Sequence, residues 1–232
     1  MGLIDTKLNI IYEDNHLLVC HKPEGVLSQK DHTNDIDMVT LVNEYLVKKY
    51  NKPNNAYVGL VHRLDRRVSG VMVFCKTSKA ANRISEQIRN HQMKKRYLCI
   101  SKGYFDGEKQ LVSYLTKDDL KAKTSEEGKK CVLDYKVVDH FAIGDDKFSV
   151  CIIDLMTGRF NQIRMQMAEI SHPIINDFKY GYKGKNYEDS LGLRCVELSF
   201  YHPVTKELLT FKDIKENEEP KWRKYLEISR YE

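Results

Sequence analysis

The chain has 232 residues, enough for one domain with a substantial core or for one core drawn out into two lobes. With 41% hydrophobic and 31% charged residues it has the balance of a soluble globular protein, and no apolar run approaches the roughly 20 residues that a membrane-spanning helix needs. The formal net charge of +5 favours a polyanionic partner only weakly. The six cysteines form no C-x-x-C pair and the histidines show no ligand spacing, so we expect reduced, buried thiols, a cytoplasmic protein and no metal.

The first half of the chain predicts short strands and two amphipathic helices. A turn is expected at residues 13–15, between the first two strands. Asp35 or Asp37 is expected to cap the first helix, and Ser78 the second. The strands are expected at residues 8–15, 16–21, 56–62, 71–75 and 97–100, and the helices at 36–50 and 78–93.

The second half begins with a polar stretch, residues 117–130, which predicts a mobile loop or an exposed hairpin. The periodicity then predicts a helix over residues 159–171 whose inward side chains are Phe160, Ile163, Met167 and Ile170. Further strands are expected at 131–141, 147–155, 193–200 and 207–214, and a short helix at 219–229 around Trp222 and Leu226. Many strands with few helices between them predict an α+β fold with a largely antiparallel sheet.

A first polar segment, His62-Arg63-Leu64-Asp65-Arg66-Arg67, places one carboxylate among three arginines at the end of an apolar strand. Nearby guanidinium charge favours the ionised form of an aspartate, and an ionised carboxylate can act as a nucleophile or a base. A structural ion pair that terminates a strand explains the same spacing.

Two more polar segments follow. Lys94-Lys95-Arg96-Tyr97 suits a phosphate contact beside a base-stacking surface, although a solvated helix end and a core tyrosine explain it equally. Residues 158–164 place Arg159, Gln162 and Arg164 at the start of the predicted helix, which favours anions. An amphipathic helix with ordinary surface arginines is the alternative.

Together these segments resemble the RluA-type RNA pseudouridine synthases. The run HRLDRRVSG from residue 62 is similar to the family's H-R-L-D-x-x-T-S-G, and GRFNQIR from residue 158 to its G-R-x-H-Q-I-R. The resemblance extends to three further motifs in the expected order, namely Lys22-Pro23-Glu24-Gly25, Lys95-Arg96-Tyr97, and Pro173-Ile174 with Asp177 and Tyr180-Gly181.

The resemblance implies a pseudouridine synthase fold, a large, mostly antiparallel mixed sheet flanked by helices with a catalytic cleft along the sheet. It implies a single catalytic domain over residues 1–232 without an N-terminal RNA-binding (S4) domain. The expected reaction isomerises uridines of ribosomal or transfer RNA by base flipping, in a monomer that needs no cofactor, no metal and no membrane.

The resemblance also implies roles for individual residues. Asp65 matches the catalytic aspartate, Tyr97 the tyrosine that packs on the flipped uracil, and Arg164 the arginine that pairs with the aspartate. Arg63 matches the arginine that fills the space left by the flipped uridine, and Ile163 would line the base pocket. The remaining residues expected to bind substrate are His62, Arg159, Asn161 and Gln162.

Four positions depart from the family pattern, namely Val68, Asn161, Asn176 and Cys195. Val68 and Asn161 keep open a non-catalytic RNA-binding protein as the alternative. A glycosidase or nucleosidase is a further alternative, in which Asp177 would be the second carboxylate. Residues 117–130 and 179–185 are candidate RNA contacts, and the sequence leaves open which uridine is modified and whether Asp65 attacks the uracil ring, attacks the ribose or acts as a base.

Overall fold

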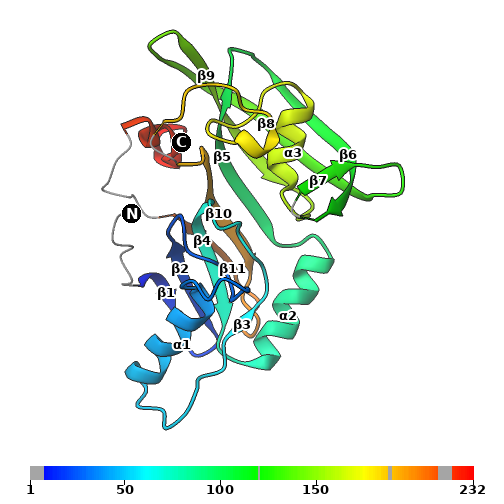
Figure 1. Ribbon diagram of the computed structural model, residues 1–232. Coiled ribbons are helices and arrows are strands. Elements are labelled where there is room, and N and C mark those ends of the chain that lie inside the picture. The colour runs from blue at the N-terminus through cyan, green and yellow to red at the C-terminus, as the bar shows by residue number, and fades with distance from the viewer. Residues whose placement is uncertain (1–7, 120, 188–189, 214–220) are drawn as a thin grey trace. The chain divides into compact units, whose positions relative to one another are not determined.

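The computed structural model describes residues 8–119, 121–187, 190–213 and 221–232 (Figure 1). The chain forms two compact units, each built from two segments. The first unit comprises Met1–Met93 and Glu197–Ile214, and the second comprises Lys94–Val196 and Lys215–Glu232. The registered strand pairs of the described residues are antiparallel, which confirms the predicted α+β fold with a mostly antiparallel sheet.

The first unit pairs its strands in the order β1-β2-β4-β10, with β3 beside β4 and β11 beside β10. All residues of β2 and β4 are buried, which explains why their sequences are continuous apolar runs rather than alternating ones. The predicted strand at 56–62 is only two residues long. The elements are β1 (Asn9–Glu13), β2 (Leu17–Lys22), α1 (Met38–Lys49), β3 (Gly59–Leu60), β4 (Ser69–Cys75), α2 (Ser78–Arg89), the end of β10 (Leu193–Tyr201) and β11 (Leu208–Lys212).

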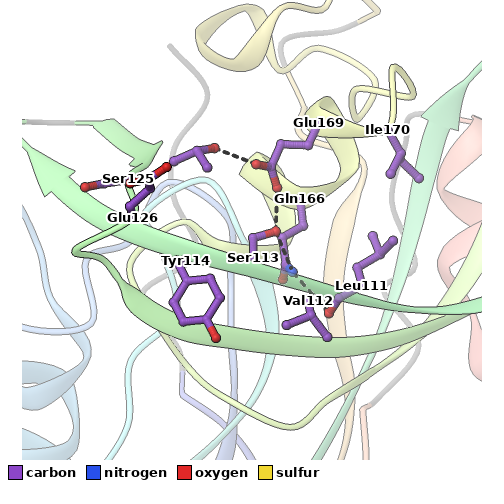
Figure 2. A pocket seen from close by; sticks show the side chains of 10 residues that line it. Leu111, Val112, Ser113, Tyr114, Ser125, Glu126, Gln166, Glu169 and Ile170 are labelled. Carbon is purple, nitrogen blue, oxygen red and sulfur yellow. Dashed lines mark hydrogen bonds between the residues drawn. The ribbon is translucent and has the colours of Figure 1, made fainter.

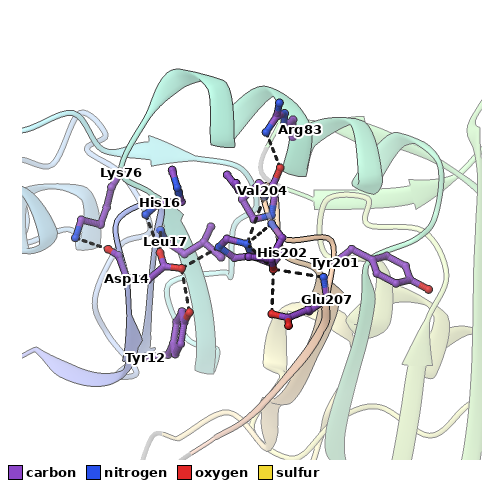
Figure 3. A network of polar contacts seen from close by, with 12 residues as sticks. Tyr12, Asp14, His16, Leu17, Lys76, Arg83, Tyr201, His202, Val204 and Glu207 are labelled. Atoms are coloured by element: carbon purple, nitrogen blue, oxygen red, sulfur yellow. Dashed lines mark hydrogen bonds and ion pairs between the residues drawn. The ribbon is translucent and has the colours of Figure 1, made fainter.

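The predicted turn between β1 and β2 is organised by one carboxylate, that of Asp14. Its Oδ1 accepts the backbone N–H groups of His16 and Leu17, both at 2.7 Å. Its Oδ2 accepts the Tyr12 hydroxyl at 2.9 Å and lies 2.8 Å from Nε2 of His202, in the turn before β11 (Figure 3). The side chain therefore organises the β1–β2 turn as an Asx turn and joins it to the turn between β10 and β11.

The predicted N-terminal cap is confirmed for α1 and was wrong for α2. Asp37 caps α1, and its Oδ1 accepts the N–H of Thr40 at 3.1 Å. Thr77 caps α2 instead of Ser78, with its Oγ1 accepting the N–H of Ala80 at 3.1 Å. The hydroxyls of Thr77 and Ser78 can both cap a helix, so the sequence alone does not decide which of these two adjacent residues is the cap.

The second unit pairs its strands in the order β10-β5-β9-β8-β6-β7. Trp222 and Leu226 pack in its core as predicted, but both lie on one 3₁₀ helix. Residues 219–220 of that prediction lie outside the described residues. The elements are β5 (Lys94–Lys102), β6 (Glu108–Asp118), β7 (Lys121–Thr124), β8 (Lys129–Ile143), β9 (Asp146–Leu155), α3 (Gln162–Glu169), η1 (Phe178–Tyr180), the start of β10, η2 (Lys221–Leu226) and η3 (Ile228–Arg230).

The polar stretch over residues 117–130 forms the exposed hairpin that was one of its two predicted states. Its strands β6 and β7 pair from Leu115↔Thr124 to Asp118↔Lys121. The prediction for α3 was wrong at its start, because the helix begins at Gln162 rather than at residue 159. Asn161 has a left-handed φ of 51°, which ends the helical periodicity, and Phe160 is 39% exposed instead of facing inward.

All six cysteines are buried. Among the described residues, no helix is long and apolar enough to cross a membrane.

Candidate functional site

Asp65 lies in the loop between β3 and β4 of the first unit, in a tight turn. The N–H of Val68 donates to the carbonyl oxygen of Asp65 at 3.0 Å. Leu64 and Val68 are 6% and 3% exposed, whereas Asp65 between them is half-buried. Two apolar anchors therefore hold the turn in the core and leave the carboxylate near the surface.

The backbone of this turn is held by two side chains, that of Lys22 at the end of β2 and that of Ser28 in the segment after it. The Ser28 hydroxyl donates to the carbonyl of Leu64 at 2.6 Å and accepts the N–H of the same residue at 3.0 Å. The ammonium of Lys22 donates to the carbonyl oxygens of Pro23, Val26 and Arg66 at 2.9, 2.6 and 3.1 Å.

Lys22 is fully buried, and its three carbonyl partners offset the large cost of taking an ammonium out of water. Lys22 belongs to a sequence motif that does not indicate these contacts, and Ser28 belongs to none of the motifs. The sequence does place Lys22 at the end of the apolar run that begins at Leu17, and this position could have indicated that its side chain is buried.

The polar residues around Asp65 divide by what they contact. His62 Nε2 accepts the N–H of Val73 at 3.1 Å, so the contact shown for this predicted substrate-binding residue is with β4. Arg66 donates to the carbonyl of Gly25 at 3.0 Å and to Asp35 at 2.7 Å, which makes it structural. Arg63 is exposed and forms no hydrogen bond or ion pair with the described residues.

In the second unit, Tyr97 lies on β5, 5% exposed and opposite Ile153 of β9. Lys95 lies on the same face, because side chains alternate along a strand. Its Nζ would lie 2.8 Å from a Cβ on Gly158, so the glycine leaves the space that the ammonium occupies. Burial lowers the pKa of Lys95 from its ordinary value. On the opposite face, Arg96 pairs with Asp154 at 2.8 and 3.0 Å.

Arg164 on α3 is fixed by a buried carboxylate. Its Nε and Nη2 each donate to one oxygen of Asp177 at 2.7 Å, and Asp177 is fully buried. The guanidinium carbon also lies 4.9 Å from the centroid of the Tyr180 ring. This bidentate geometry fixes the orientation of the guanidinium as well as its position.

Two other predicted site residues hold the segment before α3. Gln162 Oε1 accepts the Thr157 hydroxyl at 2.9 Å and the Arg159 N–H at 3.1 Å, and its Nε2 donates to Val132 O and Gln166 Oε1 at 3.2 and 3.0 Å. All four hydrogen-bonding positions of its amide are used in these contacts, so the side chain positions this loop. Arg159 is exposed and precedes the helix, which corrects its predicted place in the first turn. Ile163 is 5% exposed.

The departures from the family pattern have local explanations. Val68 closes the turn through its backbone N–H, which valine donates as well as threonine does. Asn161 donates to the Tyr180 hydroxyl at 2.9 Å. Asn176 has a φ of 63°, which asparagine tolerates nearly as glycine does, and its amide bonds Tyr187 N and O and Ser190 O at 2.6 to 2.9 Å. Cys195 is buried.

The other side of α3 packs on β6 and β7 beside an open hollow of about 390 Å³ (Figure 2). Glu169 anchors the end of the helix there, accepting the hydroxyls of Ser113 at 2.6 Å and Thr124 at 2.5 Å. Among the described residues no cluster of His, Cys, Asp or Glu could hold a metal ion.

Comparison with known proteins identifies one family. A family model described as RNA pseudouridylate synthase matches residues 16–169. A tRNA pseudouridine synthase C of Haemophilus influenzae is 30% identical, over 88% of this chain and 91% of that protein. A ribosomal large subunit pseudouridine synthase D of Xanthomonas campestris is 32% identical, over 88% of this chain and 64% of that protein. The solved human RNA Pseudouridylate Synthase Domain Containing 1 has a TM-score of 0.72 at 17% identity, covers 94% of each chain and agrees in fold.

Proposed function

We propose that this chain, which belongs to the RNA pseudouridylate synthase family and is an RNA pseudouridine synthase and hence an isomerase, converts specific uridines of transfer or ribosomal RNA to pseudouridine. In this proposal the target base is flipped out of its stack and Asp65 is the nucleophile. The observation that carries the proposal is the turn at Asp65. Its backbone is fixed by Ser28 and Lys22, and its carboxylate stays half-buried near the surface.

The proposed reaction conserves every atom. The N1–C1′ bond of uridine breaks, the uracil turns, a C5–C1′ bond forms, and the proton that leaves C5 is balanced by one that N1 gains. Asp65 forms a transient bond to the substrate and is released unchanged, whether it attacks the ribose or the ring. An ionised carboxylate suffices for this role, so the proposal needs no cofactor.

Base flipping needs a group that replaces the lost stacking, since extrusion of a base costs a few kcal/mol. The exposed guanidinium of Arg63, which has no partner among the described residues, suits the vacated space. Tyr97 is proposed to pack on the extruded uracil beside Ile163. Lys95, on the same strand face as Tyr97, is proposed to contact the phosphate of the extruded nucleotide.

Arg164 is proposed to orient Asp65. A guanidinium presents more than one pair of donors, and the Nε–Nη2 edge of Arg164 is used by Asp177. The proposal requires that the Nη1–Nη2 edge pairs with the carboxylate of Asp65. Asp177 would then be a positioning residue that keeps the guanidinium in one orientation.

The burial of Asp177 also bears on the glycosidase alternative. A glycosidase needs a second carboxyl group that exchanges a proton with substrate or water. Asp177 is fully buried and both of its oxygens accept from Arg164, so it is poorly suited to that role. Release of free uracil would be the signature of this alternative.

The test is to map pseudouridines in transfer and ribosomal RNA from cells with and without the gene. The proposal expects specific positions to revert to uridine when the gene is deleted, and to return when it is restored. Identical maps beside intact RNA binding by the purified protein would instead support a non-catalytic RNA-binding protein.

A further inference from the structure

Phe160 is an exposed aromatic ring between two cations. Its side chain is 39% exposed, although the helical pattern predicted it inward. The Nζ atoms of Lys117 on β6 and Lys179 on η1 lie 5.2 and 5.8 Å from the centroid of its ring. We call these three side chains the Phe160 patch. Each lysine belongs to one of the two segments that the sequence marked as candidate RNA contacts.

One buried hydroxyl assembles the patch. The hydroxyl of Tyr180 accepts the N–H of Ala122 at 2.7 Å and the Nδ2 of Asn161 at 2.9 Å. It thus joins the β6–β7 hairpin, the residue after Phe160 and η1, which are the three segments that carry the patch. The left-handed φ of Asn161 then turns the chain so that Phe160 leaves the core. The patch is therefore held by buried contacts beneath it.

The energies favour a nucleobase on this ring. An exposed lysine over an aromatic ring contributes about 0.5–1 kcal/mol, whereas a base stacked on an aromatic side chain contributes about 1–3 kcal/mol. A base can therefore displace a lysine from the ring, and the released ammonium then meets the phosphates on either side of that base. The acidic neighbour Asp118 is already paired with Lys123 at 2.7 Å.

The position along the chain suggests which base. Phe160 precedes Ile163 by three positions and Arg164 by four. Because consecutive Cα atoms are about 3.8 Å apart, the Cα atoms of Phe160 and Arg164 lie within about 15 Å of each other. A nucleotide bound at the Phe160 patch would therefore be a near neighbour, along the RNA, of the target uridine that Ile163 and Arg164 are proposed to contact.

We propose that Phe160 is a stacking platform for an unpaired base that neighbours the target uridine, with Lys117 and Lys179 contacting the adjacent phosphates. The inference rests on the proposed function for the identity of the target uridine. Its partner is single-stranded or looped RNA, since a base within a duplex has no free face to offer.

The first test is binding of a fluorescently labelled oligouridine of about 12 nucleotides, followed by anisotropy. Phe160→Ala is expected to weaken binding by about 5- to 100-fold, because one stacked base is lost. Phe160→Trp is expected to bind within about twofold of the parent protein. Phe178→Ala, a more exposed phenylalanine of the same unit, is the matched control and is expected to have no effect. Unchanged affinity of Phe160→Ala, or a Trp variant as weak as the Ala variant, would overturn the inference.

The two lysines give a separate readout in the same assay. Each phosphate contact on a single strand contributes about 0.7 to the slope of log affinity against log salt concentration. The double variant Lys117→Ala/Lys179→Ala is therefore expected to lower that slope by about 1.4, while Phe160→Ala leaves it unchanged. An unchanged slope in the double variant would remove the lysines from the proposal.

The link to the target uridine is tested on the RNA identified by mapping. Phe160→Ala is expected to raise KM about fivefold or more and to leave kcat within about twofold, because the ring binds a neighbouring base and does not touch the reacting atoms. A fall in kcat at constant KM would contradict a flanking-base role. Oligouridine binding involves no turnover, so the failure of this inference and the failure of the proposed function remain distinguishable.

Discussion

The turn at Asp65 and the start of α3 hold their charged residues in opposite ways. In the first unit, Lys22 and Ser28 bind main-chain atoms around Asp65. In the second unit, Asp177 binds the head group of Arg164 directly. The contacts shown for one region fix a backbone, while those shown for the other fix the charged group itself. Substitutions should therefore separate folding from chemistry in different ways in the two units.

The largest effect on stability is expected for Arg164→Met, because it leaves the buried carboxylate of Asp177 unpaired. Breaking one side of a buried ion pair costs about 3–5 kcal/mol, measurable as a loss of free energy of unfolding in urea. The double variant Arg164→Met/Asp177→Leu should recover most of that stability, since apolar replacement of a buried pair is often neutral. Pseudouridine formation should stay lost in both variants. Recovery of activity in the double variant would show that Arg164 has no role beyond folding.

A smaller loss is expected for Lys22→Met. The carbonyl oxygens of Pro23 and Val26 lose the donor shown for them, whereas that of Arg66 keeps the N–H of Gly25 at 2.9 Å. An unsatisfied buried acceptor costs about 1–3 kcal/mol. Activity should fall with stability, because Arg66 lies within the turn that begins at Asp65. The matched control is Lys49→Met, whose ion pair with Glu13 involves a 44% exposed lysine and should contribute much less to stability. Equal stability of the two variants would contradict the account.

The smallest effect concerns acid stability of the first unit. Burial alone would raise the pKa of Glu13, but hydrogen bonds from Lys49, Lys76, Tyr50 and Tyr45 lower it to about 2. A carboxyl whose pKa is lowered on folding stabilises the protein above its unfolded pKa, and that contribution is lost as pH falls from about 4.5 to about 2. Because Lys49 is partly exposed and screened, we expect a contribution of about 1–2 kcal/mol. Urea unfolding at several pH values should show this loss in the parent protein and lack it in Glu13→Gln.

Much of the fold could be predicted because its strands carry local signals. The β1–β2 turn and the pair β8 and β9 follow from apolar runs separated by polar turns, which depend only on neighbouring residues. The β6–β7 hairpin was indicated only by the polarity of residues 117–130, and no strand was predicted at residues 108–116, where most of β6 lies. The start of α3 could not be predicted this way. Its periodicity continues back to residue 159, and only the left-handed backbone of Asn161 shows that the helix begins later and that Phe160 faces outward.

The site was predictable in its motif residues and not in their partners. Asp65, Tyr97 and Arg164 were identified by order and spacing along the chain. The contact between Lys22 and the carbonyl of Arg66 spans 44 positions, and nothing in either segment indicates the other. Gln162 was predicted to bind substrate because its motif is functional, and the sequence did not indicate that its amide joins the loop before α3 to Val132 on β8 and to Gln166 on α3.

The central claim is that Asp65 is the nucleophile, and its most direct test is single-turnover pseudouridine formation by Asp65→Asn on the RNA identified by mapping. The account predicts a rate lower by roughly 10⁴-fold or more, as for loss of a nucleophile, with RNA affinity within about threefold of the parent protein. Asp35→Asn, which removes an exposed carboxylate paired with Arg66 in the same unit, should react at close to the parent rate. A near-normal rate for Asp65→Asn would contradict the account.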